Sequence, residues 1–159
     1  MAHDIALVTD STCDIPTEWR EKYEITVVPV TIVFNGTSYR DGVEMTAEQF
    51  YERLPREPQR PTTSQPSPED FLNAYRKVKE KGAKEILAII LSAAMSGTFE
   101  SARAAAMQMD IPVHTIDSQN NSMGLGWQVI VAARVREAGG GLNEMLAARY
   151  SGIFQSWNL

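Results

Sequence analysis

The chain has 159 residues, of which 43% are apolar and 22% charged, a composition typical of a single folded globular domain. Its 20 acidic and 15 basic residues give a net charge of -5, which opposes the electrostatic attraction that drives nucleic-acid binding. A single cysteine, Cys13, excludes an internal disulfide, and no stretch reads as a signal peptide or membrane span, so we expect a cytoplasmic protein.

Short apolar, β-branched runs alternate along the sequence with longer stretches of helical periodicity. The predicted strands are residues 5–9, 25–34, 85–91 and 112–117. The predicted helices are residues 16–23, 47–54, 68–81, 98–109 and 123–138. This alternation predicts an α/β fold: a mainly parallel sheet with helices on both faces.

Local signals mark the ends of two of these helices. Thr46 and Ser67 each stand three residues before a side chain that completes a capping box, Gln49 and Asp70 respectively. Gly82 is a natural stop for the helix that begins after Ser67.

The segment between the first and third predicted helices has two notable features outside the helix at 47–54. The apolar run 25–34 ends in Asn35-Gly36, a strong turn pair, which predicts a small hairpin or edge extension. Five of the eight prolines lie from Pro55 to Pro68, so this backbone is extended and stiff and is excluded from a central sheet. Its centre, residues 62–65, is dense in hydroxyls and amides, as a linker or a binding loop would be.

Three loops follow the first, third and fourth apolar runs, at residues 10–14, 92–98 and 117–122. Each is rich in small polar side chains and leads into a predicted helix, and any one of them alone reads as an ordinary cap. Ligands of parallel sheets bind beyond the carboxyl ends of the strands, where all three loops lie. Together with residues 62–65 they predict a site for an anion, held by hydroxyls and amides.

Catalytic patterns are weak, which favours a protein without turnover of its own. His3 is terminal, and His114 lies inside a predicted strand, as a core or surface histidine does. Cys13 has no basic neighbour in sequence and reads as a small packed residue. The sequence contains neither a nucleophile elbow nor a Gly-Lys-Ser/Thr phosphate loop.

Two further patterns have more than one reading. Asp10, Asp14 and Asp117 could converge on Mg²⁺, and caps and turns explain them equally well. Gly124 and Gly126 lack the third glycine of a dinucleotide-binding turn and indicate close helix packing instead.

Six sequence blocks, in order over about residues 5–138, resemble the DegV family of bacterial fatty-acid-binding proteins. The blocks are Val8-Thr-Asp-Ser-Thr-Cys-Asp-Ile-Pro16, Val28-Pro29-Val30, Tyr39-Arg-Asp-Gly42, Pro61-Thr-Thr-Ser-Gln-Pro-Ser-Pro68, Met95-Ser-Gly-Thr-Phe-Glu-Ser-Ala102, and Asp117-Ser118 with Ser122-Met-Gly-Leu-Gly126. The resemblance implies an α/β amino-terminal domain that faces a second domain, with one long-chain fatty acid buried between them.

The resemblance also implies a role and a set of contacts. Family members act as lipid carriers that present the acyl carboxylate to a separate ATP-dependent fatty acid kinase, with no cofactor or metal of their own. The carboxylate contacts would be Thr63, Ser64 and Ser96. Loop residues that support them would be Asp10, Ser11, Thr62, Ser92, Gly97, Thr98, Asp117 and Ser118.

Residues 1–150 correspond to one DegV-like domain, residues 151–159 to an atypical tail, and we expect the second domain to be absent. Its absence would expose an apolar surface beside Met95, Phe99 and the loop 122–126, so we expect a homo-oligomer, with Phe154 and Trp157 as partial lids. Two alternatives from other classes remain open: an enzyme acting on a small anionic or phosphate substrate, and a ligand-free interaction domain.

Overall fold

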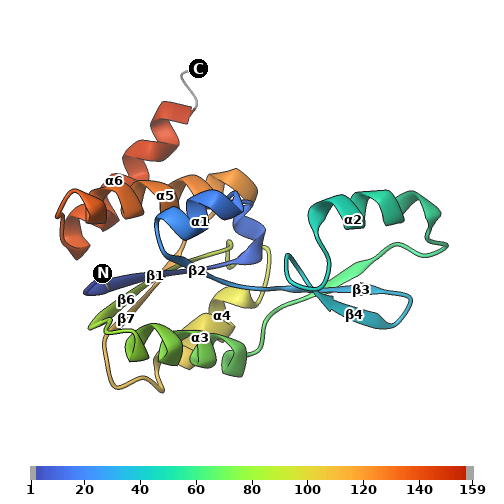
Figure 1. Ribbon diagram of the computed structural model, residues 1–159, viewed down its shortest axis with the longest axis horizontal. Helices are drawn as coiled ribbons and strands as arrows, with labels where there is room; N and C mark the ends of the chain where they lie inside the picture. Colours follow the sequence, from blue (N-terminus) through green and yellow to red (C-terminus); the bar gives the residue numbers. More distant parts are fainter. Residues whose placement is uncertain (1–2, 157–159) are drawn as a thin grey trace.

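Four parallel strands form the centre of the computed structural model, which describes residues 3–156, with side chains up to residue 150 (Figure 1). They are β1 (Ile5–Asp10), β2 (Ile25–Val28), β6 (Glu85–Ile90) and β7 (Val113–Asp117). Their order is β2-β1-β6-β7, and every neighbouring pair is parallel. The predicted α/β class with a mainly parallel sheet is confirmed.

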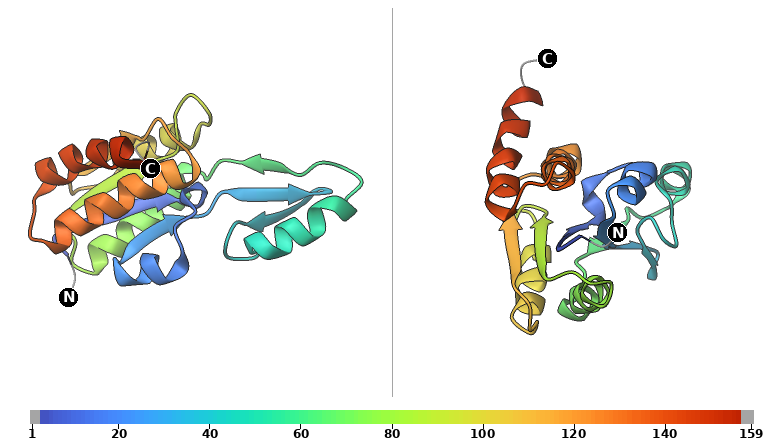
Figure 2. Two further views of the ribbon diagram at one scale, coloured as in Figure 1. Left: turned by 90° about the horizontal axis from the view of Figure 1, so that it is seen from above. Right: turned by 60° about the vertical axis from the view of Figure 1, so that its left-hand side comes forward.

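Helices cover both faces of this sheet, as predicted (Figures 1 and 2). On one face lie α1 (Thr17–Lys22) and α5 (Ser122–Glu137), and on the other lie α3 (Pro68–Glu80) and α4 (Thr98–Ala106). A short 3-10 helix, η1 (Ser11–Cys13), joins β1 to α1. We call the parallel sheet and these helices the body. Its core contains the fully buried Leu7, Leu87 and Val129.

A sixth helix, α6 (Leu142–Ser156), packs along α5 and was not predicted. Three consecutive glycines, 139–141, separate it from α5, and its apolar residues do not form a clear stripe. It includes the backbone of residues 151–156, which belong to the predicted tail. The side chains of Phe154 and Trp157, predicted as lids, lie outside the described residues.

The predicted ends of α2 (Ala47–Arg53) and α3 are confirmed by their hydrogen bonds. The hydroxyl of Thr46 accepts the amide of Gln49 at 3.2 Å, and the hydroxyl of Ser67 accepts the amide of Asp70 at 3.1 Å. Gly82 follows α3 with a φ of 108°, a left-handed conformation that glycine adopts without strain.

The apolar run 25–34, which is long for one strand, forms two strands in two different sheets. After β2 the chain meets Pro29, which has no amide to donate, and the amide of Val30 binds the Ser11 hydroxyl at 3.0 Å. The chain therefore leaves the parallel sheet, and β3 (Thr31–Phe34) begins a three-stranded antiparallel sheet ordered β4-β3-β5.

This second sheet contains the predicted hairpin and an unpredicted strand. The Asn35-Gly36 turn joins β3 to β4 (Thr37–Arg40), which confirms the hairpin. The proline-rich segment contributes β5 (Thr62–Ser64), which lies at the edge of the sheet, where prolines nearby are tolerated. We call residues 31–64, including α2 and the 3-10 helix η2 (Leu54–Arg56), the arm. The arm projects from the body beyond the carboxyl ends of its strands (Figures 1 and 2).

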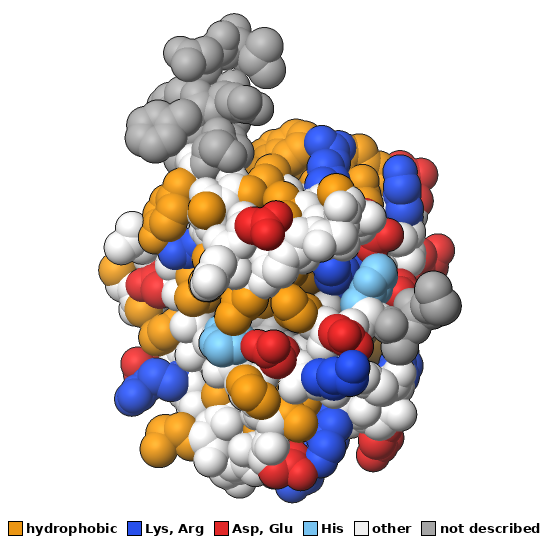
Figure 3. Space-filling view, turned by 90° about the vertical axis from the view of Figure 1, so that its left-hand side faces the viewer, with side chains coloured by type: hydrophobic (Ala, Val, Ile, Leu, Met, Phe, Trp, Pro, Cys, Tyr) orange, Lys and Arg blue, Asp and Glu red, His pale blue; other side chains and the backbone are white. Residues whose placement is uncertain are grey.

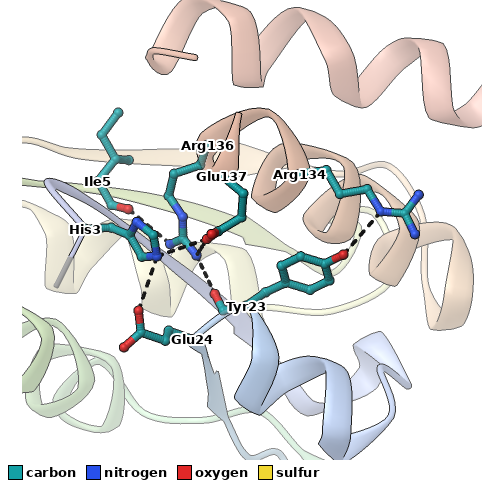
Figure 4. A network of polar contacts seen from close by, with 7 residues as sticks. All are labelled: His3, Ile5, Tyr23, Glu24, Arg134, Arg136 and Glu137. Carbon is teal, nitrogen blue, oxygen red and sulfur yellow. Dashed lines mark hydrogen bonds and ion pairs between the residues drawn. The ribbon is translucent and has the colours of Figure 1, made fainter. Parts of the chain in front are cut away.

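At the opposite end of the body, Arg136 of α5 connects the start of β1 to the residue that follows α1 (Figure 4). Its guanidinium is buried and donates to the carbonyls of Ile5, at 3.2 Å, and Tyr23. Beside it, His3 pairs with Glu24 at 3.2 Å and Glu137 at 3.0 Å. Acidic and basic side chains alternate over this end, which presents no large area of one sign (Figure 3).

Candidate ligand-binding cleft

A cleft of about 740 Å³ opens between the arm and the carboxyl ends of the body's strands. The body contributes residues just after β1 and β6, the loop before α4 and the start of α5. The arm contributes β3, β5 and α2. This is the end of a parallel sheet at which ligands bind, so the position matches the expectation from the three polar loops.

Thr63, Ser64 and Ser96 all line this cleft, although Ser96 lies more than thirty residues from the other two. Side chains alternate along β5, so Thr63 shares a face of the arm sheet with its partner Ile32, which also lines the cleft. Ser64 pairs with Thr31 on the opposite face. Thr63 is therefore better directed toward the cleft than Ser64.

Ser96 lies at the amino end of α4. Its Oγ is 2.8 Å from Oγ1 of the buried Thr98 and accepts the Thr98 amide at 3.2 Å. Gly97 and Thr98 line the cleft with it. The first amides of a helix point outward at the positive end of its dipole, so this corner attracts a negative group.

Of the predicted supporting residues, Asp10 braces two loops. It is fully buried, and its carboxylate accepts the amide of Thr12 at 3.0 Å and that of Leu91 at 2.8 Å. Burial raises the pKa of Asp10, and these hydrogen bonds oppose the increase. These hydrogen bonds thereby tie the loop after β1 to the end of β6, the strand that leads into the loop of Ser96.

Asp117, Ser118 and Ser92 brace the third loop in the same way. The Asp117 carboxylate accepts the amides of Ala93, at 3.1 Å, and Gln119, at 2.9 Å. The Ser118 hydroxyl and the Ser92 amide both donate to the carbonyl of Asn120, each at 3.0 Å. These three residues and Thr62 are not among those that line the cleft, whereas Ser11, Gly97 and Thr98 are.

The three aspartates that the sequence left open for Mg²⁺ are not brought together. Asp14 lines the cleft, whereas Asp10 and Asp117 are engaged in the loop contacts above. Within residues 3–156, no three His, Cys, Asp or Glu side chains gather closely enough to hold a metal ion.

Sequence reasoning missed the second carboxylate of the cleft, Asp41. Burial raises the pKa of Asp41, and a hydrogen bond from the Ser11 hydroxyl opposes the increase. Asp41 follows β4 and meets the cleft only because the hairpin folds back beside Val30, whose carbonyl accepts the Asp41 amide at 2.9 Å. The described side chains that line the cleft include Asp14 and Asp41 but no Lys, Arg or His.

Asp14 is held at the rim by Ser122, whose hydroxyl donates to its carboxylate across 108 positions of sequence. Both residues have a positive φ, 52° for Asp14 and 49° for Ser122. Such conformations are unfavourable for residues other than glycine and gather at functional sites.

Apolar side chains complete the cleft. Val30, Ile32 and Phe50 line it from the arm side, and Leu91 and Met95 line it from the body. Met95 is 61% exposed. A ligand with one anionic end and a long apolar portion would match both kinds of surface.

Cys13 and His114 take no part in the cleft. Cys13 is buried, and desolvation raises the pKa of its thiol to about 11, so it packs as predicted rather than acting as a nucleophile. His114 lies on β7 and contacts Glu85 on the neighbouring strand at 3.0 Å. In the described part of the chain, no helix is long and apolar enough to cross a membrane.

Comparison with known proteins identifies one family. The model of the DegV family, described as "Uncharacterised protein, DegV family", matches residues 4–151. A DegV domain-containing protein of Streptomyces coelicolor is 38% identical over 149 residues, which are 93% of this chain and 52% of that protein.

Solved structures give the same result. A DegV family protein of Thermus thermophilus, whose structure is described as showing fatty acid binding, superposes with a TM-score of 0.85 at 37% identity, over 94% of this chain and 53% of that one. A stearic acid-binding protein of Eubacterium ventriosum has a TM-score of 0.81 at 30% identity, over 91% of this chain and 51% of that one. The chain thus spans about half the length of the relatives that it matches.

Proposed function

Because the chain belongs to the DegV family, we propose that it binds a long-chain fatty acid in the cleft between the arm and the body. The hydroxyls of Thr63, Ser64 and Ser96 hold the carboxylate. The single observation that carries this proposal is that Thr63 of β5 and Ser96 of the loop before α4 line one cleft beside apolar side chains.

The geometry supports a carboxylate rather than a bulkier or neutral polar group. Hydroxyl donors and the amino end of α4 favour one negative charge beside Ser96. The apolar residues Ile32, Phe50 and Met95 offer a path for the acyl chain. Each buried methylene of that chain contributes about 0.8 kcal/mol.

We further propose that the protein is a carrier without turnover, which delivers its ligand to a separate ATP-dependent kinase. The buried, high-pKa Cys13 and the loop-bound Asp10 and Asp117 leave the cleft without an activated nucleophile and base pair among its described residues. Residues 1–150 act in this proposal as one domain of a two-domain carrier, which fits the half-length match to the relatives.

The proposal is tested by extracting the purified protein under denaturing conditions and analysing the extract by mass spectrometry. We expect a fatty acid of defined chain length, or uptake of added stearic acid at one per chain. A protein that neither contains nor takes up fatty acid would refute the proposal. Turnover of ATP or a phosphate ester by the purified chain would instead favour an enzyme.

A further inference from the structure

The arm and the body have separate hydrophobic cores. The arm core consists of Ile32, Phe34 and Met45, with Tyr39 and Phe50 packed against it. The body core is a different cluster, and the two sheets share no strand pairing. The attachment of the arm therefore depends on the two chain crossings, near Val30 and Gln65, and on the polar contacts made there.

The first polar anchor is Ser11. This residue is buried at the end of β1, and its hydroxyl oxygen accepts the amide of Val30 at 3.0 Å. The Ser11 hydroxyl also faces the Asp41 carboxylate of the hairpin, and its influence lowers the pKa of Asp41 against the larger effect of burial. One body side chain thus holds Val30 at the root of β3, and the carbonyl of Val30 in turn accepts the amide of Asp41 at the end of β4.

The second polar anchor is Gln65. Its Nε2 donates to the hydroxyl of Ser101, on α4 of the body, at 3.3 Å. Its amide group also lies against Gly97, where any Cβ would clash with it. The absence of a side chain at Gly97 therefore lets the arm approach the amino end of α4, next to Ser96.

Both anchors line the same cleft as Thr63 and Ser96, at the root of the arm. Val30 stands opposite both Asp41 and Gln65 when the registers of the arm sheet are continued by one residue, so all three occupy one row across the sheet. Thr63 lies on the same face, two residues along β5 from Gln65. Thr63 belongs to the arm and Ser96 to the body, so their separation depends on the angle between the two units.

We propose that Ser11 and Gln65 are positioning residues, which fix the arm on the body and hold Thr63 and Ser96 at a separation that one carboxylate spans. The inference rests on the proposed fatty-acid site. When an anchor is removed, the arm swings, the cleft widens, and the ligand can contact only one of its two walls at a time.

The test combines a distance measurement with a binding measurement. Spin labels are placed at Cys residues that replace Glu52 on α2 and Met107 at the end of α4, both exposed, in a Cys13→Ala background. Electron paramagnetic resonance then gives the distance distribution between arm and body. Dodecanoate affinity is measured on the same proteins without labels.

We expect Ser11→Ala and Gln65→Ala each to broaden the distribution and to weaken dodecanoate binding by threefold to tenfold, the usual effect of one lost hydrogen bond. Gln65→Glu retains an acceptor for the Ser101 hydroxyl and should restore the narrow distance distribution, whereas its negative charge beside the carboxylate site should keep dodecanoate binding weak. Gln108→Ala, just after α4, and Ser38→Ala on β4 are exposed controls and should change neither.

The inference would be overturned if the arm–body distance distribution were unchanged in both Ser11→Ala and Gln65→Ala. It would also be overturned if either variant bound dodecanoate more weakly without a broader distance distribution. Gln65 is exposed, so its variants fold even if Ser11→Ala does not. If the parent protein binds no dodecanoate or stearate, the proposed function fails, and the distance distributions still decide whether the anchors fix the arm.

Discussion

The backbone carbonyl of Cys13 occupies the space that a side chain at Gly126 would need. This contact brings α5 directly against η1, at the base of the cleft, and it explains a Gly-Leu-Gly sequence that has no nucleotide-binding partner residues. The close packing predicted for these glycines is confirmed at Gly126.

Gly126→Ala should destabilise the protein, because the added methyl group meets backbone, which cannot rotate away. We expect a loss of about 1–3 kcal/mol in the free energy of unfolding, measured by urea denaturation. Gly141→Ala is the matched control, since a Cβ there has no neighbour within 4 Å. Equal stability of the two variants would contradict the packing described.

Arg136→Met tests the hydrogen bonds that Arg136 makes at the end of the body opposite the arm. Methionine fills a similar volume but leaves the carbonyls of Ile5 and Tyr23 without their donor, so we expect a loss of about 2–4 kcal/mol. Arg134→Met is the control, because Arg134 is exposed. Its Nε donates to the hydroxyl of Tyr23 (Figure 4), and its guanidinium lies over the ring of Trp19. Its expected loss is under about 1 kcal/mol. If Arg134→Met lowers the free energy of unfolding as much as Arg136→Met does, loss of the buried hydrogen-bond donors does not explain the destabilisation.

Asp41 should make stability depend on pH. Burial raises its pKa in the folded protein above the ordinary value of 3.8, so the folded state holds this proton more tightly than the unfolded state. The contribution of protonated Asp41 to the free energy of unfolding is complete below about pH 4, and it is lost as the pH rises through the pKa of Asp41 in the folded protein. Asp41→Asn should therefore gain stability relative to the parent as pH rises through that range.

A control of opposite sign accompanies this measurement. Lys79 lowers the pKa of Asp110, so the Asp110 contribution is present above about pH 4 and is lost on acidification. Asp110→Asn should thus lose stability relative to the parent at neutral pH. Parallel pH profiles for the parent and Asp41→Asn would contradict the assignment.

The sequence was informative where structure depends on neighbours along the chain. The strands β1, β6 and β7 follow from β-branched runs, and α3 follows from a capping box at Ser67 and the buried stripe at Phe71, Leu72, Tyr75 and Val78. The turn at Asn35-Gly36 and the stop at Gly82 depend on backbone conformation alone. Each of these signals is local, so each could be interpreted without knowledge of the tertiary fold.

Errors occurred where a distant residue decides the outcome. The run 25–34 splits because Ser11, nineteen positions away, binds the amide of Val30. The proline-rich segment forms β5 because β3 offers it an edge. Asp41 reaches the cleft through the same hairpin, and no local pattern marks it as a neighbour of Thr63 or Asp14.

The predicted homo-oligomer has a specific surface to test. Tyr51 and Met95 line the cleft and are 70% and 61% exposed, so the rim presents apolar area that soluble monomers rarely leave open. We expect the apparent mass in light scattering to rise with protein concentration, and Tyr51→Ser with Met95→Gln to reduce the increase. Met107→Gln removes a side chain that is 79% exposed outside the cleft and should have no effect. A strict monomer at all concentrations would refute this expectation.

The hydroxyls of Thr63 and Ser96 should determine carboxylate affinity. A hydrogen bond to a charged group contributes roughly 1.5–3 kcal/mol, so Thr63→Val and Ser96→Ala should each weaken fatty-acid binding by about tenfold to a hundredfold. Thr62→Val is the matched control, because Thr62 pairs with Val33 on the other face of the arm sheet and does not line the cleft. Titration calorimetry with dodecanoate measures all three variants, and thermal unfolding checks that their stability is preserved.

Thr63→Val should weaken fatty-acid binding more than Ser64→Ala does, since strand alternation directs only Thr63 toward the face that Ile32 shares. If Thr63→Val and Ser96→Ala both bind as tightly as Thr62→Val, the carboxylate does not lie between the arm and α4.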